Sequence, residues 1–120
     1  MNTDGITDSI IGCAITVSNA LGVGFLEKVY ENALAHELAK AGLRAKQQQA
    51  INVSYDGVVV GEYTADLVVE DMVIVELKAA KAIDPVHEAQ LLNYLRATGV
   101  KVGLILNFGT PRLGIKRMVW

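Results

Sequence analysis

Apolar side chains in the first forty residues recur every three or four positions, the spacing of helices that bury one face. One such stretch covers residues 6–21, and two glycines at positions 22 and 24 then interrupt the pattern. A second stretch covers residues 26–38, and Gly42 follows where the end of a helix favours glycine. The pattern therefore predicts two consecutive helices.

From residue 51 the spacing changes to the alternation that is typical of strands. The pair Asp56-Gly57 is a strong hairpin signal, and it separates a strand that includes residues 51–55 from one over residues 58–69. Gly61 suggests a bulge in the second strand. A polar turn near residues 70–72 leads to an apolar strand over residues 73–77. Three antiparallel strands in succession are predicted.

The last third of the chain predicts a helix between two strands. Asp84-Pro85 is a typical helix start, with Asp as N-cap and Pro at the first position, and Gly99 would end the helix. Residues 102–106 form a buried strand and residues 115–120 a short edge strand. A strand-helix-strand step over residues 73–107 implies a parallel pair with a right-handed crossover. We expect one α/β domain over residues 1–120, a mixed sheet flanked by helices.

Composition supports an ordinary globular protein. Hydrophobic residues make up 52% of the 120 and charged residues 20%, which excludes disorder. No apolar run reaches the roughly 18 residues that a membrane span needs. The first residues include no Lys or Arg and do not resemble a signal peptide, so we expect a cytoplasmic protein. Cys13 lies on the first helical pattern, where a small buried hydrophobe is the simpler interpretation than a nucleophile.

Three polar residues stand where a central pair of strands should carry hydrophobic ones. Asp66 lies in the second strand, and Glu76 and Lys78 lie two apart on the third, so the last two project from one face. If Leu77 shares the opposite, apolar face with its neighbours, Asp66 falls beside Glu76. This register requires an odd number of residues in the turn near 70–72.

Two adjacent carboxylates repel each other unless a proton or a cation lies between them. Mg²⁺ is the sharper hypothesis, because it is held by a few carboxylate oxygens and waters and is completed by substrate phosphate. Lys78 would then orient the water or stabilise developing charge. The simpler alternative is a salt-bridged strand face in which an Asp, a Glu and a Lys keep one side of the sheet wet.

The helix after Lys78 adds a polar stripe. His87, Gln90 and Tyr94 follow one another at spacings of three and four, while neighbouring leucines supply the core face. Asp66, then Glu76-x-Lys78, then Gln90-x-x-x-Tyr94 resembles the PD-(D/E)XK (restriction-endonuclease-like) nuclease superfamily, in particular its exonuclease-like branch.

A second set of motifs resembles the small bacterial proteins of the GxxExxY family. The segments that carry this resemblance are Gly24-Phe-Leu-Glu27-Lys-Val-Tyr30, Ala65-Asp66, Val75 to Ala79, His87 to Leu95, Gly103 to Gly109 and Lys116-Arg117. Together they cover nearly the whole chain. One departure from the superfamily pattern is Ala65, which stands where the name of the motif has proline.

The resemblance implies a role for each matching residue. Asp66 and Glu76 would bind Mg²⁺ (or Mn²⁺) with the main-chain carbonyl of Leu77, and Lys78 would be the catalytic lysine. Glu27 would be a further acidic member of the site, as a metal ligand or by holding a water. Gln90 and Tyr94 would contact metal-bound water or a substrate phosphate.

Four other residues are weaker candidates for substrate contact, each with an ordinary structural alternative. Tyr30 would be partly core with its hydroxyl at the rim. His87 would be a hydrogen-bonding residue on the helix surface. Lys116 and Arg117 could meet a phosphate backbone, or be ordinary surface charges. Glu27 itself could be a solvated helix charge.

The expected activity is hydrolysis of a nucleic-acid phosphodiester bond, with DNA favoured over RNA and with a homodimer or a partner protein to enlarge the surface. The formal net charge of −2 argues against tight, extended binding, because phosphate neutralisation needs basic residues. It does not exclude cleavage. The alternative is a non-catalytic module that keeps the fold and binds a protein or a nucleic acid.

Overall fold

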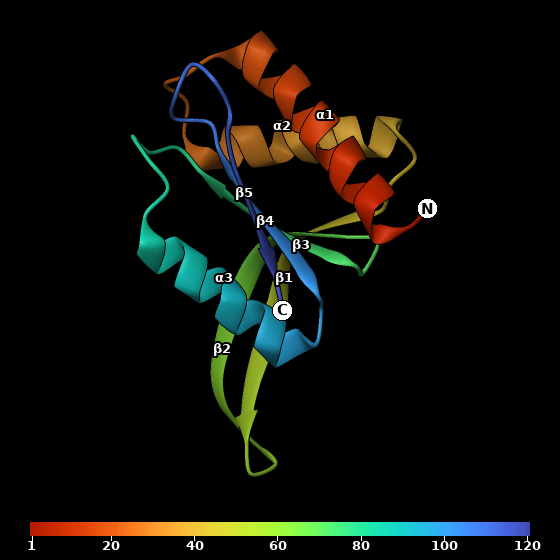
Figure 1. The fold of residues 1–120 in the computed structure, drawn as a ribbon, viewed down its shortest axis with the longest axis vertical. Helices are drawn as coiled ribbons and strands as arrows, with labels where there is room; N and C mark the ends of the chain where they lie inside the picture. Colours follow the sequence, from red (N-terminus) through yellow and green to blue (C-terminus); the bar gives the residue numbers. More distant parts are fainter.

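Five strands form one mixed sheet between two layers of helices in the computed structural model, which describes residues 1–120 (Figure 1). In chain order the elements are α1 (Thr3–Leu21), α2 (Glu27–Lys40), β1 (Ala45–Tyr55), β2 (Val58–Val69), β3 (Val73–Lys78), α3 (Pro85–Thr98), β4 (Val102–Asn107) and β5 (Gly114–Val119). The predicted order of elements and the α/β class are confirmed. None of the helices is long and apolar enough to cross a membrane.

The strands follow their sequence order in the sheet, and one pair is parallel. β1 with β2, β2 with β3, and β4 with β5 are antiparallel, whereas β3 and β4 run parallel on either side of the crossover through α3. The helix starts as predicted, because the Asp84 side chain accepts a hydrogen bond from the Val86 amide at 2.9 Å. Gly99 ends it in the left-handed conformation.

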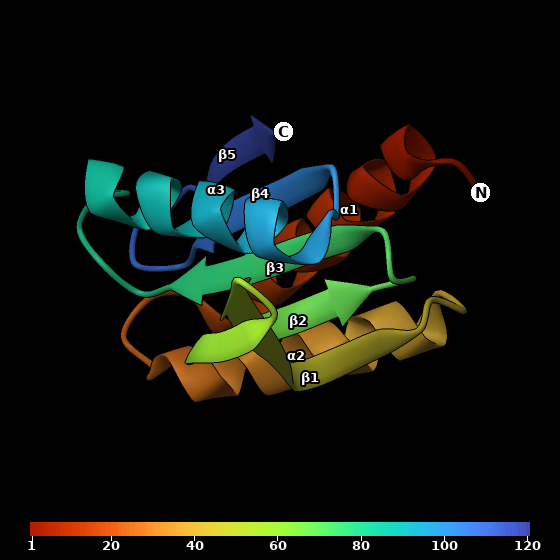
Figure 2. The ribbon, with the colours of Figure 1, turned by 90° about the horizontal axis from the view of Figure 1, so that it is seen from below.

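Each face of the sheet has its own hydrophobic core. α1 and α2 cover one face, with Ile10, Tyr30 and Leu34 packed on Leu67, Val75 and other strand residues. α3 covers the other face with Leu91, Tyr94 and Leu95 over Ile74 and Ile105. Figure 2 shows the strands from β1 at the bottom to β5 at the top, with α3 in front of them and with α1 and α2 behind. Side chains of alternate strand positions therefore belong to different layers.

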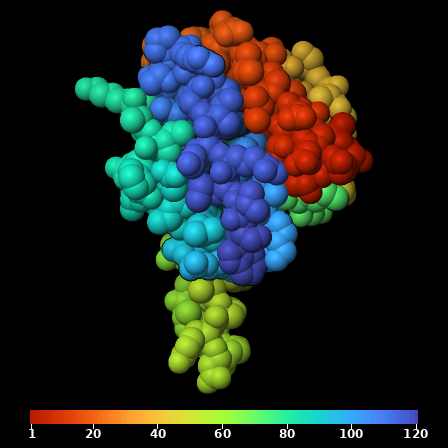
Figure 3. Space-filling view, viewed as in Figure 1, coloured from red at the N-terminus to blue at the C-terminus, as the bar shows by residue number.

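The β1–β2 hairpin extends beyond the body of the protein (Figures 1 and 3). Its register shifts between Val53 and Ser54, which pair with Gly61 and Val59, so Val60 is the extra residue of the bulge expected near Gly61. Asp56 and Gly57 at the tip both have positive φ, as the predicted tight turn requires. Tyr55 and Val58 at this end are largely exposed.

β1 begins earlier than the alternation suggested. It starts at Ala45 and includes the glutamine run of residues 47–49, which has no apolar alternation to mark it as a strand. Arg44, just before it, holds the β2–β3 turn: its backbone N–H and its Nε donate to the Glu70 carboxylate at 2.8 and 3.1 Å. Glu70 and Asp71 both have positive φ, so the turn depends on such contacts.

Asn107 ties together the two loops that follow β3 and β4. Its Oδ1 accepts hydrogen bonds from the Ala80 and Gly109 amides at 3.0 and 3.1 Å, and its Nδ2 donates to the Ala80 carbonyl at 2.9 Å. The Phe108 amide donates to the Lys78 carbonyl at 2.8 Å. Side-chain and backbone bonds thus hold the end of β3.

We expect Gly109→Ala to destabilise the protein by about 3 kcal/mol, because a Cβ at this position would collide with the Ala80 backbone, which cannot move aside as a flexible side chain can. Gly12→Ala is the control: it lies on α1 with open space around it, and should stabilise by up to about 1 kcal/mol. Urea unfolding measures both. Equal effects of the two substitutions would contradict the expectation.

Candidate active site at the end of the β2–β3 ladder

The register of β2 against β3 brings the predicted carboxylates together. Leu67 pairs with Val75 and Val69 with Val73, which leaves three residues in the turn. The expected odd number is confirmed. Leu67, Val75 and Leu77 belong to the core under α1 and α2, so Asp66 and Glu76 project toward the α3 face.

Where the β2–β3 ladder ends, two hydrogen bonds connect Asp66 with Glu76 and Leu77. The Leu77 amide donates to Asp66 Oδ2 at 2.8 Å, and the Asp66 amide donates to Glu76 Oε2 at 3.3 Å. Glu76 is only 8% exposed. Burial is the main reason that the pKa of Glu76 is raised to about 9, and the adjacent Asp66 carboxylate adds to it. The Lys78 charge opposes this shift only weakly. Without a cation, Glu76 therefore holds a proton at neutral pH in a place with little water.

Lys78 ends β3 two residues after Glu76 and projects from the same face. It is half-buried and forms no salt bridge with any acidic side chain. Its backbone pairs with Asn107 of β4, whose side chain holds the following loop. Lys78 is therefore a positioned cation with an uncommitted ammonium group.

A residue that sequence reasoning missed, Glu31 of α2, extends the site. It is 4% exposed, and its carboxylate accepts hydrogen bonds from Gln47 at 2.8 Å and Gln48 at 2.7 Å, with Lys28 at 3.0 Å. Gln48 Nε2 also lies 3.4 Å from Asp66 Oδ1. An amide thus bridges the carboxylates of Glu31 and Asp66.

The backbone of Gln48 makes this bridge possible. Successive residues of a regular strand point to opposite faces, yet Gln47 and Gln48 both reach Glu31. Gln48 has a φ of 51° and no partner in the ladder, which breaks the alternation. A non-glycine residue in this region costs roughly 1–3 kcal/mol and is typical of functional sites. The sequence signal for Glu31 was a charge at helical spacing from the buried Leu34 and Leu38.

The two predicted residues of α2 take other places. Glu27 lies exposed at the first residue of the helix, one turn, roughly 6 Å, before Glu31. Tyr30 is fully buried, stacks on Phe108, and its hydroxyl donates to the Gly22 carbonyl at 2.7 Å and accepts from the Phe25 amide at 3.2 Å. Tyr30 therefore holds the α1–α2 loop and presents no surface to a substrate.

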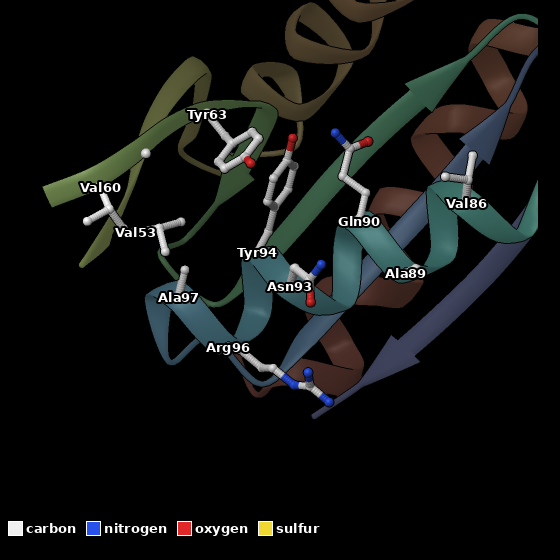
Figure 4. A pocket seen from close by; sticks show the side chains of 11 residues that line it. Val53, Val60, Tyr63, Val86, Ala89, Gln90, Asn93, Tyr94, Arg96 and Ala97 are labelled. Carbon is white, nitrogen blue, oxygen red and sulfur yellow. The ribbon is translucent and has the colours of Figure 1, made fainter. Parts of the chain in front are cut away.

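Of the polar stripe of α3, Tyr94 lies near the two carboxylates. Figure 4 shows Gln90 and Tyr94 side by side, with Tyr94 against Tyr63 of β2. Burial is the main reason that the pKa of Tyr94 is raised to about 12, and the charges of Glu76 and Asp66 add to it. The Tyr94 hydroxyl therefore stays protonated at neutral pH. His87 is partly buried, and its Nδ1 has no hydrogen-bond partner.

Lys116 and Arg117 do not form one patch. They are consecutive residues of β5, the strand at the far edge of the sheet from β1, and point to opposite faces. Lys116 lies 3.5 Å from Glu88 of α3, and Arg117 lies 3.0 Å from Asp4 of α1. Both have acidic partners within the chain, and their predicted contact with substrate stays a prediction.

The side chains at the end of the ladder fit a divalent cation. Mg²⁺ prefers oxygen ligands and is usually bound by one or two carboxylates. Waters and substrate phosphate complete its coordination shell. The raised pKa of Glu76 indicates that its carboxylate lacks a compensating charge. No group of three or more His, Cys, Asp or Glu side chains converges on one point, and the role of Glu27 as a further ligand stays a prediction.

A five-stranded mixed sheet with carboxylates and a lysine at the end of its central strands defines the restriction-endonuclease-like class. One solved structure, the crystal structure of SSO0001, matches 77% of the chain with a TM-score of 0.60 and 16% identity. The chain spans about half of that protein, 48% of its length. At this identity the likeness shows the fold. No curated protein matches the chain.

The pattern of the PD-(D/E)XK nuclease superfamily matches residues 4–118. The chain therefore belongs to this superfamily, and the resemblance drawn from the motifs is confirmed at that level. PD-(D/E)XK nucleases generally use divalent metals.

Glu76→Gln should stabilise the protein in EDTA at neutral pH, by on the order of 2 kcal/mol, because it removes a carboxylate that folding desolvates. Because the pKa of Glu76 is higher in the folded state than in the unfolded state, the wild type has its full stability below about pH 4.5. It becomes less stable as the pH rises toward about 9. The advantage of the variant should therefore grow between these values. Unfolding by urea at pH 5, 7 and 9 measures it, and a constant difference would contradict the expectation.

Proposed function

We propose that the protein is a metal-dependent nuclease that hydrolyses phosphodiester bonds through Asp66, Glu76 and Lys78. The observation that carries this proposal is the buried Glu76 carboxylate beside Asp66, with the unpaired Lys78 two residues further on the same strand. A structural face would have paired these charges with one another. Here both carboxylates lack a cation, and the lysine lacks an anion.

Each residue has a distinct task in the proposed reaction. Asp66 and Glu76, with the Leu77 carbonyl, would hold Mg²⁺ (or Mn²⁺), which when bound supplies positive charge to the phosphate and lowers the pKa of water. Lys78 would donate to the attacked phosphate and stabilise the charge that develops on it. Gln90 and the protonated Tyr94 are hydrogen-bond donors toward phosphate or water. Glu31 and Gln48 orient Asp66 from the opposite side.

The proposed branch of the superfamily rests on the sequence motifs. The segment Gly24 to Tyr30 supports membership in the GxxExxY branch, and Tyr30 would serve it by holding the loop that precedes Glu27. DNA is the first substrate to test, and RNA the second. A homodimer or partner protein would enlarge a small binding surface, and the expected location is the cytoplasm. A non-catalytic binding module is the alternative, and the next experiment separates the two.

Titration calorimetry should detect binding of Mg²⁺ or Mn²⁺ by the wild type and none by an Asp66→Asn, Glu76→Gln double variant, because the variant lacks both anionic ligands. Asp71→Asn is the matched control: it removes an exposed carboxylate at the β2–β3 turn and should bind metal as the wild type does. If the wild type binds no metal even in the presence of an oligonucleotide, the protein is the non-catalytic module.

Lys78→Met should keep metal binding and lower the rate of cleavage by about 100-fold or more, since it removes one donor to the developing charge. The comparison is Lys81→Met, an exposed lysine in the loop after β3, which should cleave at the wild-type rate. The assay follows labelled DNA and RNA with Mg²⁺ and with EDTA. Equal rates for both variants would remove Lys78 from the mechanism.

A further inference from the structure

A groove of about 700 Å³ lies between the β1–β2 hairpin and α3 (Figure 4). Val53, Val60 and Tyr63 form its hairpin wall. Its helix wall includes Gln90, Asn93, Tyr94 and one cation, Arg96. Pockets of roughly 300–1,000 Å³ are the size that takes up small ligands, so the groove has room for a few chemical rings and excludes a double helix.

The groove lies beside the candidate active site, and Tyr94 belongs to both. Asp66, Glu76 and Lys78 do not line the groove, but the charges of Glu76 and Asp66 act on the Tyr94 hydroxyl. A ligand in the groove therefore contacts Tyr94, one of the residues proposed to bind the phosphate.

The walls favour flat apolar rings over phosphates. Tyr63 is 49% exposed, and its ring centroid lies 5.6 Å from that of Tyr94 with the planes inclined by 47°, so an accessible aromatic face remains. The hairpin from residue 51 to residue 63 carries Asp56 and Glu62 but no Lys or Arg. Binding of a duplex depends on cations along its phosphates, which this wall cannot supply.

Unpaired nucleotides match this combination. Their bases stack on aromatic side chains with little dependence on sequence, and the amides of Gln90 and Asn93 offer donors and acceptors to base edges. A base inside a duplex has its faces covered by its neighbours and cannot stack on Tyr63. The projecting hairpin would reach the bases only where the strands are separate.

We infer that the hairpin–α3 groove binds unpaired nucleobases beside the scissile phosphate, so that the protein acts on single strands or frayed ends in preference to duplex. This inference rests on the proposed nuclease function and specifies its substrate class. Tyr63 is the residue that determines the preference, by stacking on a base.

Fluorescence anisotropy of a labelled 12-nucleotide single strand and of its duplex tests the inference, with Asp66→Asn in the full chain as the background that prevents cleavage. Tyr63→Ala should weaken binding of the single strand by about tenfold, whereas Tyr63→Phe, which keeps the ring, should stay within about twofold. Tyr55→Ala is the control: it removes an exposed tyrosine of the same hairpin that does not line the groove. Thermal unfolding of each variant checks that it folds.

Four outcomes separate the two hypotheses. Loss of single-strand binding in Tyr63→Ala alone, with weaker binding of duplex by the parent, supports the groove whether or not the wild type cleaves. Absence of cleavage in that case removes the nuclease proposal only. If the wild type cleaves but Tyr63→Ala binds like its parent, the groove inference is wrong and the nuclease proposal stands. A dimer that Tyr63→Ala dissociates would overturn the inference in favour of a second copy as occupant.

Discussion

Where β2 and β3 stop pairing through their backbones, two carboxylates take over the hydrogen bonds. Asp66 accepts from the Leu77 amide, and Glu76 accepts from the Asp66 amide. This exchange depends on the three-residue turn, because a shift of one residue would turn one of the two acids into the core under α1 and α2. The conformation of this turn depends on Arg44, which holds Glu70 in a left-handed conformation. The position of the site is thus set by contacts between residues that are ten or more positions apart in the sequence.

The same region concentrates the features that a protein selected for stability alone would avoid. Glu76 is buried beside another acid, Glu31 is buried on the apolar side of α2, and Gln48 has a strained backbone in the middle of β1. Such departures from local rules gather where function requires them, and the surrounding structure compensates for them. Here the compensation includes two hydrophobic cores, one on each face of the sheet.

The two faces of the sheet contribute differently to the site. On the β1 side, α2 contributes Glu31, which is linked to Asp66 through the Gln48 amide. Tyr30 of the same helix stacks on Phe108 and so secures the loop before α2. α3 contributes Tyr94 near the carboxylates and also forms one wall of the hairpin groove (Figure 4). A short helix therefore connects the reacting groups with the surface that would select the substrate.

By itself the sequence determined the order of the elements, the face on which Asp66, Glu76 and Lys78 lie, and the polar stripe of α3. These follow from periodicity and turn residues, which are local properties. Only the tertiary structure decided that Glu31, rather than Glu27, is the buried acid of α2, and that the glutamine run is part of the site. Both depend on how α2 packs against β1 and on one residue with positive φ. No local pattern records such packing, because it joins residues that are far apart in the chain.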